Sequence, residues 1–197
     1  MNMIISAVSQ GLLWSILALG LFVSFRILDL ADMTTEGAFP LGAAVAVQAI
    51  TLGANPYIAI IFAIIAGSSA GLITGFLITK LQIPSLLAGI LTMTGLYSIN
   101  LRVMGRANIS LLGKNTIFTV FENMNLPRHF DTITLGLLVV VMIIGLYVIF
   151  FKTEFGQAVI ATGDNEAMAR SLGISTNTMK IVGLMISNGI VALAGSI

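Results

Sequence analysis

Three carboxylates lie close together just before a long apolar run, where they could bind a cation. Asp29, Asp32 and Glu36 precede residues 37–79, which carry no charge. Carboxylates are also favourable near the N-terminus of a helix, because the helix dipole is positive at that end. The residue types alone leave three alternatives open: a cation site, a charge arrangement at a helix start, and a solvated turn.

Other groups suited to catalysis or metal binding are scarce. The chain has no cysteine and one histidine, His129, which lies in a polar stretch beside Pro127 and Arg128. Zinc sites need three or four such ligands, so none can be built around this histidine. The charge-free blocks contain no carboxylate pair that an intramembrane enzyme could use. We therefore predict no catalytic residues, no metal site and no enzymatic activity for this chain.

The run from Ser85 to Leu101 predicts a membrane-spanning helix with polar side chains among apolar neighbours. Polar groups at membrane depth face protein or water rather than lipid, so one interpretation is a path for a polar solute. The other is structural, since hydroxyls also bond back to their own helix. The predicted path residues are Thr92, Thr94, Ser98 and Asn100, and the same two interpretations apply to Gln48, Ser187 and Asn188.

The stretch Glu154–Lys180 carries the most specific local pattern. Asp164 or Asn165 can cap a helix, Glu166 suits its positive end, and Gly173 suits the left-handed position after its last turn. The predicted helix has about two turns and is far too short to span a membrane. A short capped helix with exposed apolar residues suits docking to a soluble partner. Its apolar residues are Ala167, Met168, Leu172 and Ile174.

Composition places these groups in a membrane protein. Of 197 residues, 57% are hydrophobic and 9% are charged, and the mean hydropathy is +1.06. A soluble domain carries about a quarter charged residues, so the polar surface here is too small to cover a globule in water. The net charge of +1 argues against a nucleic-acid partner. Residues 1–25, 37–79, 81–101, 132–151 and 181–197 carry no charge and are each long enough for one or two crossings.

Turn signals divide these blocks into helices. Leu52–Pro56 is a Gly/Asn/Pro turn within residues 37–79, and Pro84 marks the next break. Thr34 or Thr35 could cap the second helix. The predicted fold is all-α, a polytopic transmembrane bundle of about six spanning or partly spanning helices. These helices cover Ile4–Phe25, Phe39–Thr51, Tyr57–Thr79, Ser85–Leu101 and Ile133–Phe151, and a sixth begins near Ile181.

Small residues repeat with a spacing of four in two of the predicted helices. Gly67, Gly71 and Gly75 share one face of the third helix, and Ala38, Gly42 and Ala46 share one face of the second. Missing side chains let another backbone approach closely, so we predict tight helix packing at both strips.

The polar stretch Arg102–Asp131 makes the orientation of the chain in the membrane hard to assign. Within this stretch, helix signals occur only at Ile117–Asn123. If Lys152–Lys180 is cytoplasmic, alternation of crossings places this stretch outside with four of the nine basic residues. That contradicts the positive-inside tendency, so either one block is re-entrant or the tendency fails here. The sequence stops at Ile197 inside an apolar run. We therefore expect residues 1–197 to be a single transmembrane domain, truncated within a helix.

Glu154–Lys180 resembles the cytoplasmic coupling loop of ABC importer permeases of the branched-chain amino acid and ribose type. That loop reads Gly, a few residues, Ala-x-Gly-x-Asn, then Ala-x-x-x-Gly-Ile. Residues 28–43 and 83–90 also resemble early helices of this family, and within it the chain is similar to permeases for tryptophan, tyrosine or other amino acids. The matching loop residues are Gly156, Ala161, Gly163, Asn165, Ala169, Gly173 and Ile174.

The resemblance implies a permease subunit in a bacterial-type plasma membrane that carries a small polar solute such as an amino acid. It implies three partners: a separate ABC ATPase, a second permease copy, and an extracytoplasmic substrate-binding protein. The chain lacks a Gly-x-x-x-x-Gly-Lys-Ser/Thr phosphate loop, so ATP and Mg would be bound by the ATPase and no cofactor by this chain. The residues expected to couple to the ATPase are Gly163, Asp164, Asn165, Glu166, Ala169, Arg170 and Gly173.

An ATP-independent carrier or channel is the alternative function. Such a protein is expected to place ionisable residues within its spans as ion relays, and the charge-free blocks hold none. The substrate itself does not follow from the sequence, because small and hydroxyl residues could line a path for amino acids, sugars or nucleosides alike.

Overall fold

A computed structural model describes residues 2–105, 109 and 130–197. The helix signals at Ile117–Asn123 and the lone His129 lie outside these residues. Every regular element in the described ranges is a helix. In chain order these are α1 (Asn2–Phe22), the π-helical η1 (Val23–Ile27), α2 (Thr34–Thr51), α3 (Pro56–Thr79), α4 (Ser85–Met104), α6 (Phe130–Lys152), α7 (Glu154–Asp164), α8 (Glu166–Ser171) and α9 (Thr176–Ser196).

Within the described residues, five helical segments are long and apolar enough to cross a membrane: α1 continued into η1, α3, α4, α6 and α9. α2 is a further long helix, with 18 residues. Large apolar side chains on the outer faces are exposed, as expected of helices whose solvent is lipid. Examples are Leu137, Val141 and Ile149 on α6. The prediction of an all-α polytopic bundle with about six spanning or partly spanning helices is confirmed.

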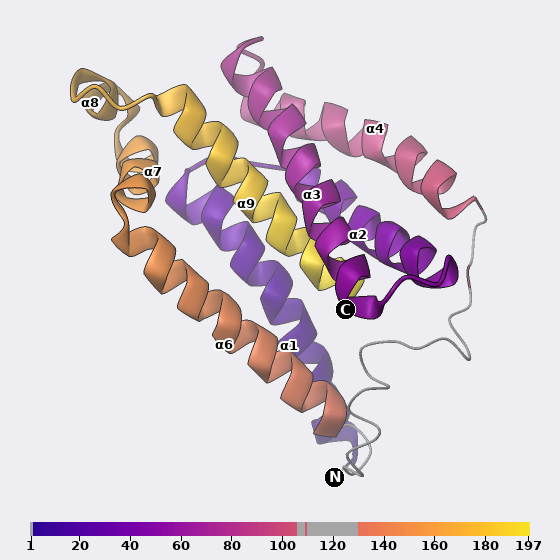
Figure 1. The fold of residues 1–197 in the computed structure, drawn as a ribbon. Helices are drawn as coiled ribbons and strands as arrows, with labels where there is room; N and C mark the ends of the chain where they lie inside the picture. Colours follow the sequence, from indigo (N-terminus) through magenta and orange to yellow (C-terminus); the bar gives the residue numbers. More distant parts are fainter. Residues whose placement is uncertain (1, 106–108, 110–129) are drawn as a thin grey trace.

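α9 runs through the centre of the bundle, between α1 and α3 (Figure 1). The glycine strip Gly67, Gly71 and Gly75 of α3 lies against it. A Cβ at Gly71 would overlap the backbone of Leu184, and a Cβ at Gly75 would lie 2.9 Å from the Cα of Ile181. Backbones approach this closely where side chains are missing, so the strip brings α3 into direct contact with α9.

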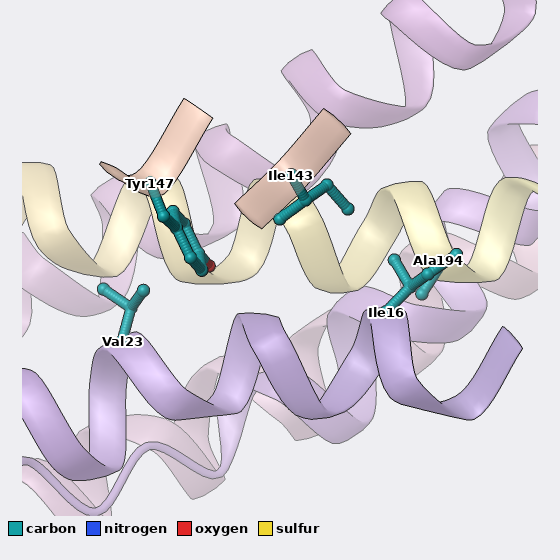
Figure 2. Packing of buried hydrophobic residues seen from close by; sticks show 5 residues of the cluster. All are labelled: Ile16, Val23, Ile143, Tyr147 and Ala194. Atoms are coloured by element: carbon teal, nitrogen blue, oxygen red, sulfur yellow. The ribbon is translucent and has the colours of Figure 1, made fainter. Parts of the chain in front are cut away.

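α1 and α6 pack side by side and meet α9 in a shared apolar cluster (Figures 1 and 2). The Tyr147 hydroxyl donates a 2.8 Å hydrogen bond to the carbonyl of Leu19. The polar end of the ring is thus satisfied within an apolar contact. The buried residues of this cluster are Ile16, Val23, Ile143, Tyr147 and Ala194.

α2 begins at Thr34, earlier than the predicted start at Phe39. The expectation that Thr34 or Thr35 caps it is also wrong, because neither side chain bonds the free N–H groups at its start. Asp32 does so instead: its Oδ1 accepts from the Thr34 N–H over 2.9 Å. Glu36 lies in the first turn, where the helix dipole favours a carboxylate. A charge at that position therefore does not mark the boundary of the helix.

The first turn of α2 lies inside the bundle rather than at a membrane surface. Thr34 contacts Thr74 of α3, and Phe39 and Gly42 pack against the second half of α9 at Gly195 and Ala192. From this inner start, α2 runs to the turn at residues 52–55, where Asn55 caps α3 by accepting from the Tyr57 N–H. α2 is consequently a partly spanning helix.

At the other end of the bundle, α7 and α8 form a corner between α6 and α9 (Figure 1). The sequence analysis placed only one short helix in this stretch and missed α7, which Thr153 caps by accepting from the Gly156 N–H over 3.1 Å. α9 likewise begins at Thr176, before the predicted Ile181. We name residues 154–175 the coupling corner.

The order of crossings is simple alternation within the described ranges. Lys80, at the end of α3, lines one cavity together with Glu166 of α8. Gly163 of α7 lies against Ile27, next to Arg26. These three segments therefore share the end of the bundle that carries the coupling corner. A re-entrant block that changes the parity is not found among the described helices.

Candidate functional site

The four predicted path residues lie on two faces of α4. Thr92 and Asn100 are buried against the bundle, whereas Thr94 and Ser98 are exposed. The Thr94 hydroxyl donates to the carbonyl of Ile90 over 3.0 Å, which is the back-bonding alternative considered above. The structure therefore does not bring the four side chains together into one stripe.

Thr92 instead ends a buried chain of hydroxyl groups that joins three helices. Thr34 of α2 and Thr74 of α3 share a 2.7 Å hydrogen bond, and Thr74 donates to Thr92 of α4 over 2.9 Å. Thr92 donates in turn to the carbonyl of Ala88. Because polar groups cannot bond water at this depth, such a chain holds the start of α2 between α3 and α4.

The carboxylate of Asp32 lies in the same region and is 1% exposed. Its Oδ2 accepts a 2.7 Å hydrogen bond from Nδ2 of Asn188, which lies midway along α9 and also donates to the carbonyl of Leu184. Asp32 has no cationic partner within the described residues. Two further polar residues of the sequence analysis, Ser187 and Asn188, are thus buried, and Ser187 donates to the Gly20 carbonyl over 2.8 Å.

The three carboxylates near α2 have separate environments. Asp29 is exposed on the connection after η1 with a left-handed backbone, φ 51°. Asp32 bonds the start of α2, and Glu36 projects from its first turn. They do not converge into a metal-binding group within the described part of the chain. The charge arrangement at a helix start is the alternative that Asp32 fits.

Glu36 is exposed and lines two open cavities. One has a volume of about 290 Å³ and lies against α4, where Met93, Thr94 and Asn100 contribute to its wall. The other has a volume of about 600 Å³ and lies against α1, where Trp14 stacks on Phe39 at 5.9 Å between ring centroids. Both cavities border the first turns of α2 at Glu36, and we name the two together the α2 groove.

One acidic side chain of the coupling corner makes a charged contact with α9, beside the apolar packing of Val159 on Met179 and Leu184. Oε2 of Glu166 is 2.7 Å from Nζ of Lys180, and its Oε1 is 2.9 Å from the Arg170 guanidinium. The hydrogen bond from Lys180 is the main reason why the pKa of the Glu166 carboxyl is lowered from its ordinary value, with Thr176 and Arg170 adding to the effect. α8 and the first turn of α9 are therefore linked by charged and neutral hydrogen bonds.

The caps of α8 define its length. Oδ1 of Asn165, rather than Asp164, accepts from the Met168 N–H over 3.0 Å. Gly173 has φ +83° and ends the helix, and the Ile174 N–H reaches back to the Ala169 carbonyl over 3.1 Å. The left-handed position favours glycine, as the sequence predicted.

The other predicted coupling residues differ in what they contact. Gly163 packs against the backbone of Ile27 and Leu28, and Ala169 is 1% exposed, so both hold the corner to its own chain. Met168 and Leu172 are 61% and 69% exposed although they are apolar. Met168 and Leu172 thus form the apolar part of the outward surface of α8. The sequence predicted them as apolar residues of a docking helix, but not among the coupling residues.

The glycine strip of α3 also contains a spacing known from hydrolases. Residues 67–71 match the Gly-x-Ser-x-Gly spacing of hydrolase nucleophiles. That motif works on a sharp turn between a strand and a helix, whereas Ser69 lies within α3 and donates to the Ala66 carbonyl over 2.6 Å. The spacing here serves the glycine strip.

The family model described as "Branched-chain amino acid transport system / permease component" matches residues 3–197. The chain belongs to this permease family. The resemblance inferred from the coupling corner and the early helices is thereby confirmed over almost the full chain.

The chain is similar to three curated relatives, two of which are named as permease proteins. A tyrosine transport system permease protein of Clostridioides difficile is 42% identical over 197 residues, covering 100% of this chain and 64% of the relative. An uncharacterized protein of Rickettsia prowazekii is 38% identical over 197 residues and 68% of its own length. An autoinducer 2 import system permease protein of Yersinia enterocolitica is 32% identical over 149 residues, 75% of this chain and 40% of the relative.

The chain therefore spans about two thirds or less of the lengths of these relatives. No solved structure matches it significantly. The family membership and the five apolar helices of the described residues indicate a multi-pass membrane protein of this permease family.

The sequence suggested Asp32 and Glu36 as part of a cation site, a charge arrangement at a helix start or a solvated turn, but not as groups within the depth of the bundle. Asp32 and Glu36 were placed outside the spans because the charge-free block begins at Gly37, yet α2 starts before both the block and Glu36. The available signal was the Asp-x-Thr spacing, in which Asp32 bonds the Thr34 N–H as a local cap.

Proposed function

We propose that this chain is the permease subunit of an ATP-binding-cassette importer in a bacterial-type plasma membrane. It would carry a small polar solute, an amino acid in the first instance, and take its energy from ATP and Mg bound on a separate ATPase. The observation that supports this most directly is the coupling corner: a short capped helix that exposes Met168 and Leu172 and is tied to α9 through Glu166 and Lys180.

The contacts of α9 supply a route from the corner to the α2 groove. Lys180 joins α9 to α8, and two turns later Asn188 joins it to Asp32 beside the start of α2. Glu36 projects from that first turn into the groove. Packed helices switch between discrete arrangements, so a displacement of α8 by a closing ATPase would shift α9 and α2 together.

The open groove supports the remaining partners. The α2 groove lies on the outside of a single chain, so a second permease copy would be needed to enclose a path there. An extracytoplasmic binding protein would deliver the solute. An amino acid is favoured as solute because the relative at 42% identity is named for tyrosine transport.

The test is to replace the outward apolar residues of α8 in the full-length protein. Ala169 is buried within the chain, so enlarging it would damage the corner itself. Met168→Asp and Leu172→Asp change only the exposed surface. Both should lower ATP-dependent uptake of L-tyrosine by about tenfold or more in proteoliposomes holding the ATPase and binding protein, because truncating a central docking contact commonly costs at least about 2 kcal/mol.

Leu52→Asp is the matched control, since Leu52 is 78% exposed in the turn at the opposite end of the bundle. It should leave ATPase coupling unchanged. Unaltered uptake and unaltered stimulation of ATP hydrolysis in both α8 variants would remove the basis for an ATP-driven importer.

A gradient-driven carrier or channel remains the second candidate, and the structure gives it a specific argument. Asp32 is an ionisable group buried inside the bundle, and the exposed Glu36 lines the two cavities beside it, as an ion relay would require. Uptake into vesicles under an ion gradient without nucleotide, lost in Asp32→Asn, would favour this function over the importer.

A further inference from the structure

The Glu36 carboxyl group lies at about mid-depth of the spanning helices, and no cation among the described residues pairs with it. Its two cavities are lined by Leu17 and by Thr94, which lie near the centres of the spans Ser6–Ile27 and Ser85–Met104. Within the described part of the chain the Glu36 side chain forms no ion pair and no hydrogen bond, and the salt bridges there belong to Glu166. An ionisable side chain at this depth faces a water-filled path or a partner charge.

The smaller cavity also gathers uncharged oxygen acceptors. Asn100 lines it and is 8% exposed, and its Oδ1 is buried without a hydrogen-bond partner. Its Nδ2 donates to the carbonyl of Gly37, which leaves Oδ1 as the free end of the amide. A buried acceptor without a partner is costly and uncommon, so it points to a donor outside the described residues.

A proline adds a third acceptor. Pro40 lies within α2 and lines the same cavity. It has no N–H to donate to the carbonyl of Glu36, four residues earlier, which is the usual helical partner of that carbonyl. The cavity is thus lined by Glu36, whose backbone carbonyl lacks its usual helical donor, and by Asn100, whose amide oxygen has no partner among the described residues.

We propose that Glu36 and Asn100 form a binding site for a primary ammonium group of the transported solute, midway along the α2 groove. An ammonium group offers three donors and one positive charge, which matches three oxygen acceptors of which one is anionic. The adjoining cavity of about 600 Å³, lined by Trp14 and Phe39, would take an apolar or aromatic part of the same solute. This inference rests on the proposed transport function and names the chemistry of its site.

The described sequence contains no cysteine, so introduced thiols can report on the cavity. Thr94→Cys places a thiol on its wall in the full-length protein in membrane vesicles. We would compare labelling by aminoethyl methanethiosulfonate, which carries a primary ammonium, with labelling by the anionic sulfonatoethyl reagent. The rate of labelling by the cationic reagent is divided by the rate for the anionic reagent, and this ratio is corrected by the same ratio measured for 2-mercaptoethanol. The corrected ratio should be about ten or more, because a charged cleft concentrates ions of opposite sign.

Glu36→Gln should reduce that preference to within about twofold, whereas Glu154→Gln, the same change at the exposed start of α7, should leave it intact. Tyr97→Cys, on the same wall, serves as a second reporter if Thr94→Cys is poorly folded. Ile149→Cys, similarly exposed on α6, should react with neither reagent where that face meets lipid.

Competition tests the ammonium group directly. Tyramine should slow labelling of Thr94→Cys about fivefold at saturation. The compound 4-ethylphenol, which lacks the amine, should not slow it. The effect of tyramine should disappear when Glu36→Gln is added. A charge preference that survives Glu36→Gln, no competition by tyramine, or no labelling of either reporter would each overturn the site. If the charge preference and competition are present but ATP drives no uptake of any solute, the importer function fails and the ammonium site stands.

Discussion

Nδ2 of Asn188 donates to Oδ2 of Asp32 over 2.7 Å at the centre of the bundle, and both side chains are almost completely buried. Oδ1 of the same carboxylate caps α2 through the Thr34 N–H. One acidic group therefore joins α9, which begins at the coupling corner, to the helix that forms the floor of the α2 groove. Buried carboxylates are costly unless their oxygens are bonded, so this junction has few tolerable arrangements.

Asn188→Leu should weaken the bundle because it removes one hydrogen bond from a buried carboxylate. A hydrogen bond to a charged group contributes about 1.5–3 kcal/mol, and we expect a loss of that order in the free energy of unfolding. Unfolding in mixed micelles with increasing sodium dodecyl sulfate would measure it. Asn177→Leu, on the exposed side of α9, should change little. Equal unfolding midpoints for the two variants would show that the hydrogen bond between Asn188 and Asp32 does not stabilise the bundle.

Gly71→Ala should separate α3 from α9, since the added Cβ would lie 2.9 Å from the Cα of Met185 and closer still to the Leu184 carbonyl. Overpacking of this kind costs about 1–3 kcal/mol. Gly145→Ala on α6 is the matched control, because nothing lies within 4 Å of its Cβ. That control should be neutral or stabilising by up to about 1 kcal/mol through helix propensity. If the same measurement showed no change in the free energy of unfolding for Gly71→Ala, the glycine strip would not be a packing contact between α3 and α9.

The link between α8 and α9 should weaken in acid. The folded-state pKa of Glu166 lies below its ordinary value of 4.5, chiefly through the hydrogen bond from Lys180. A lowered pKa means that the link is fully present above about pH 4.5 and is lost as the pH falls through the lower folded value. The contribution is small, below about 1 kcal/mol, because Arg170 and Glu166 are substantially exposed.

Carbon-13 NMR of labelled glutamate would follow this titration, with Glu166→Gln to assign the resonance. Lys180→Met should raise the midpoint towards the ordinary value, since it removes the principal cause of the shift. A midpoint unaffected by Lys180→Met would disprove the ion pair in solution.

Tyr147→Phe should loosen the contact between α1 and α6. The variant removes the 2.8 Å hydrogen bond to the Leu19 carbonyl while keeping the ring in its cluster. Hydrogen bonds between helices in a membrane contribute about 0.6 kcal/mol on average and at most about 1.7 kcal/mol. Tyr57→Phe, on an exposed ring at the start of α3, provides the comparison. A thermal unfolding scan in detergent that ranks the two variants equally would contradict this role.

The helices were predictable where a single physical signal dominated. The turn before α3 contains Gly53, Asn55 and Pro56, and the structure shows the positive φ of Gly53 and the cap by Asn55 at those positions. α7 was missed because it is an amphipathic helix of only 11 residues, too short to be found when only membrane-length apolar runs are sought. The early start of α2 was missed because charge was equated with solvent.

The site was less predictable because it depends on which face of a helix meets which neighbour. Thr92 and Asn100 turn inward, and Thr94 and Ser98 turn outward, although all four satisfy the same rule for polar residues in a span. The contact of Asp32 with Asn188 joins positions that no local pattern relates. Periodicity assigns residues to faces, but the partner of each face follows only from the assembled bundle.

The distance in sequence between Asp32 and Asn188, 156 positions, sets an order of events during synthesis. At about 5–20 residues per second a ribosome needs roughly 8–30 s to make the intervening chain. During that time the Asp32 carboxylate lacks the hydrogen bond from Asn188. The segment before α2 is therefore expected to stay in water or in the translocon while α1 and α3 enter the bilayer. The last helix described here thus completes the insertion of the second.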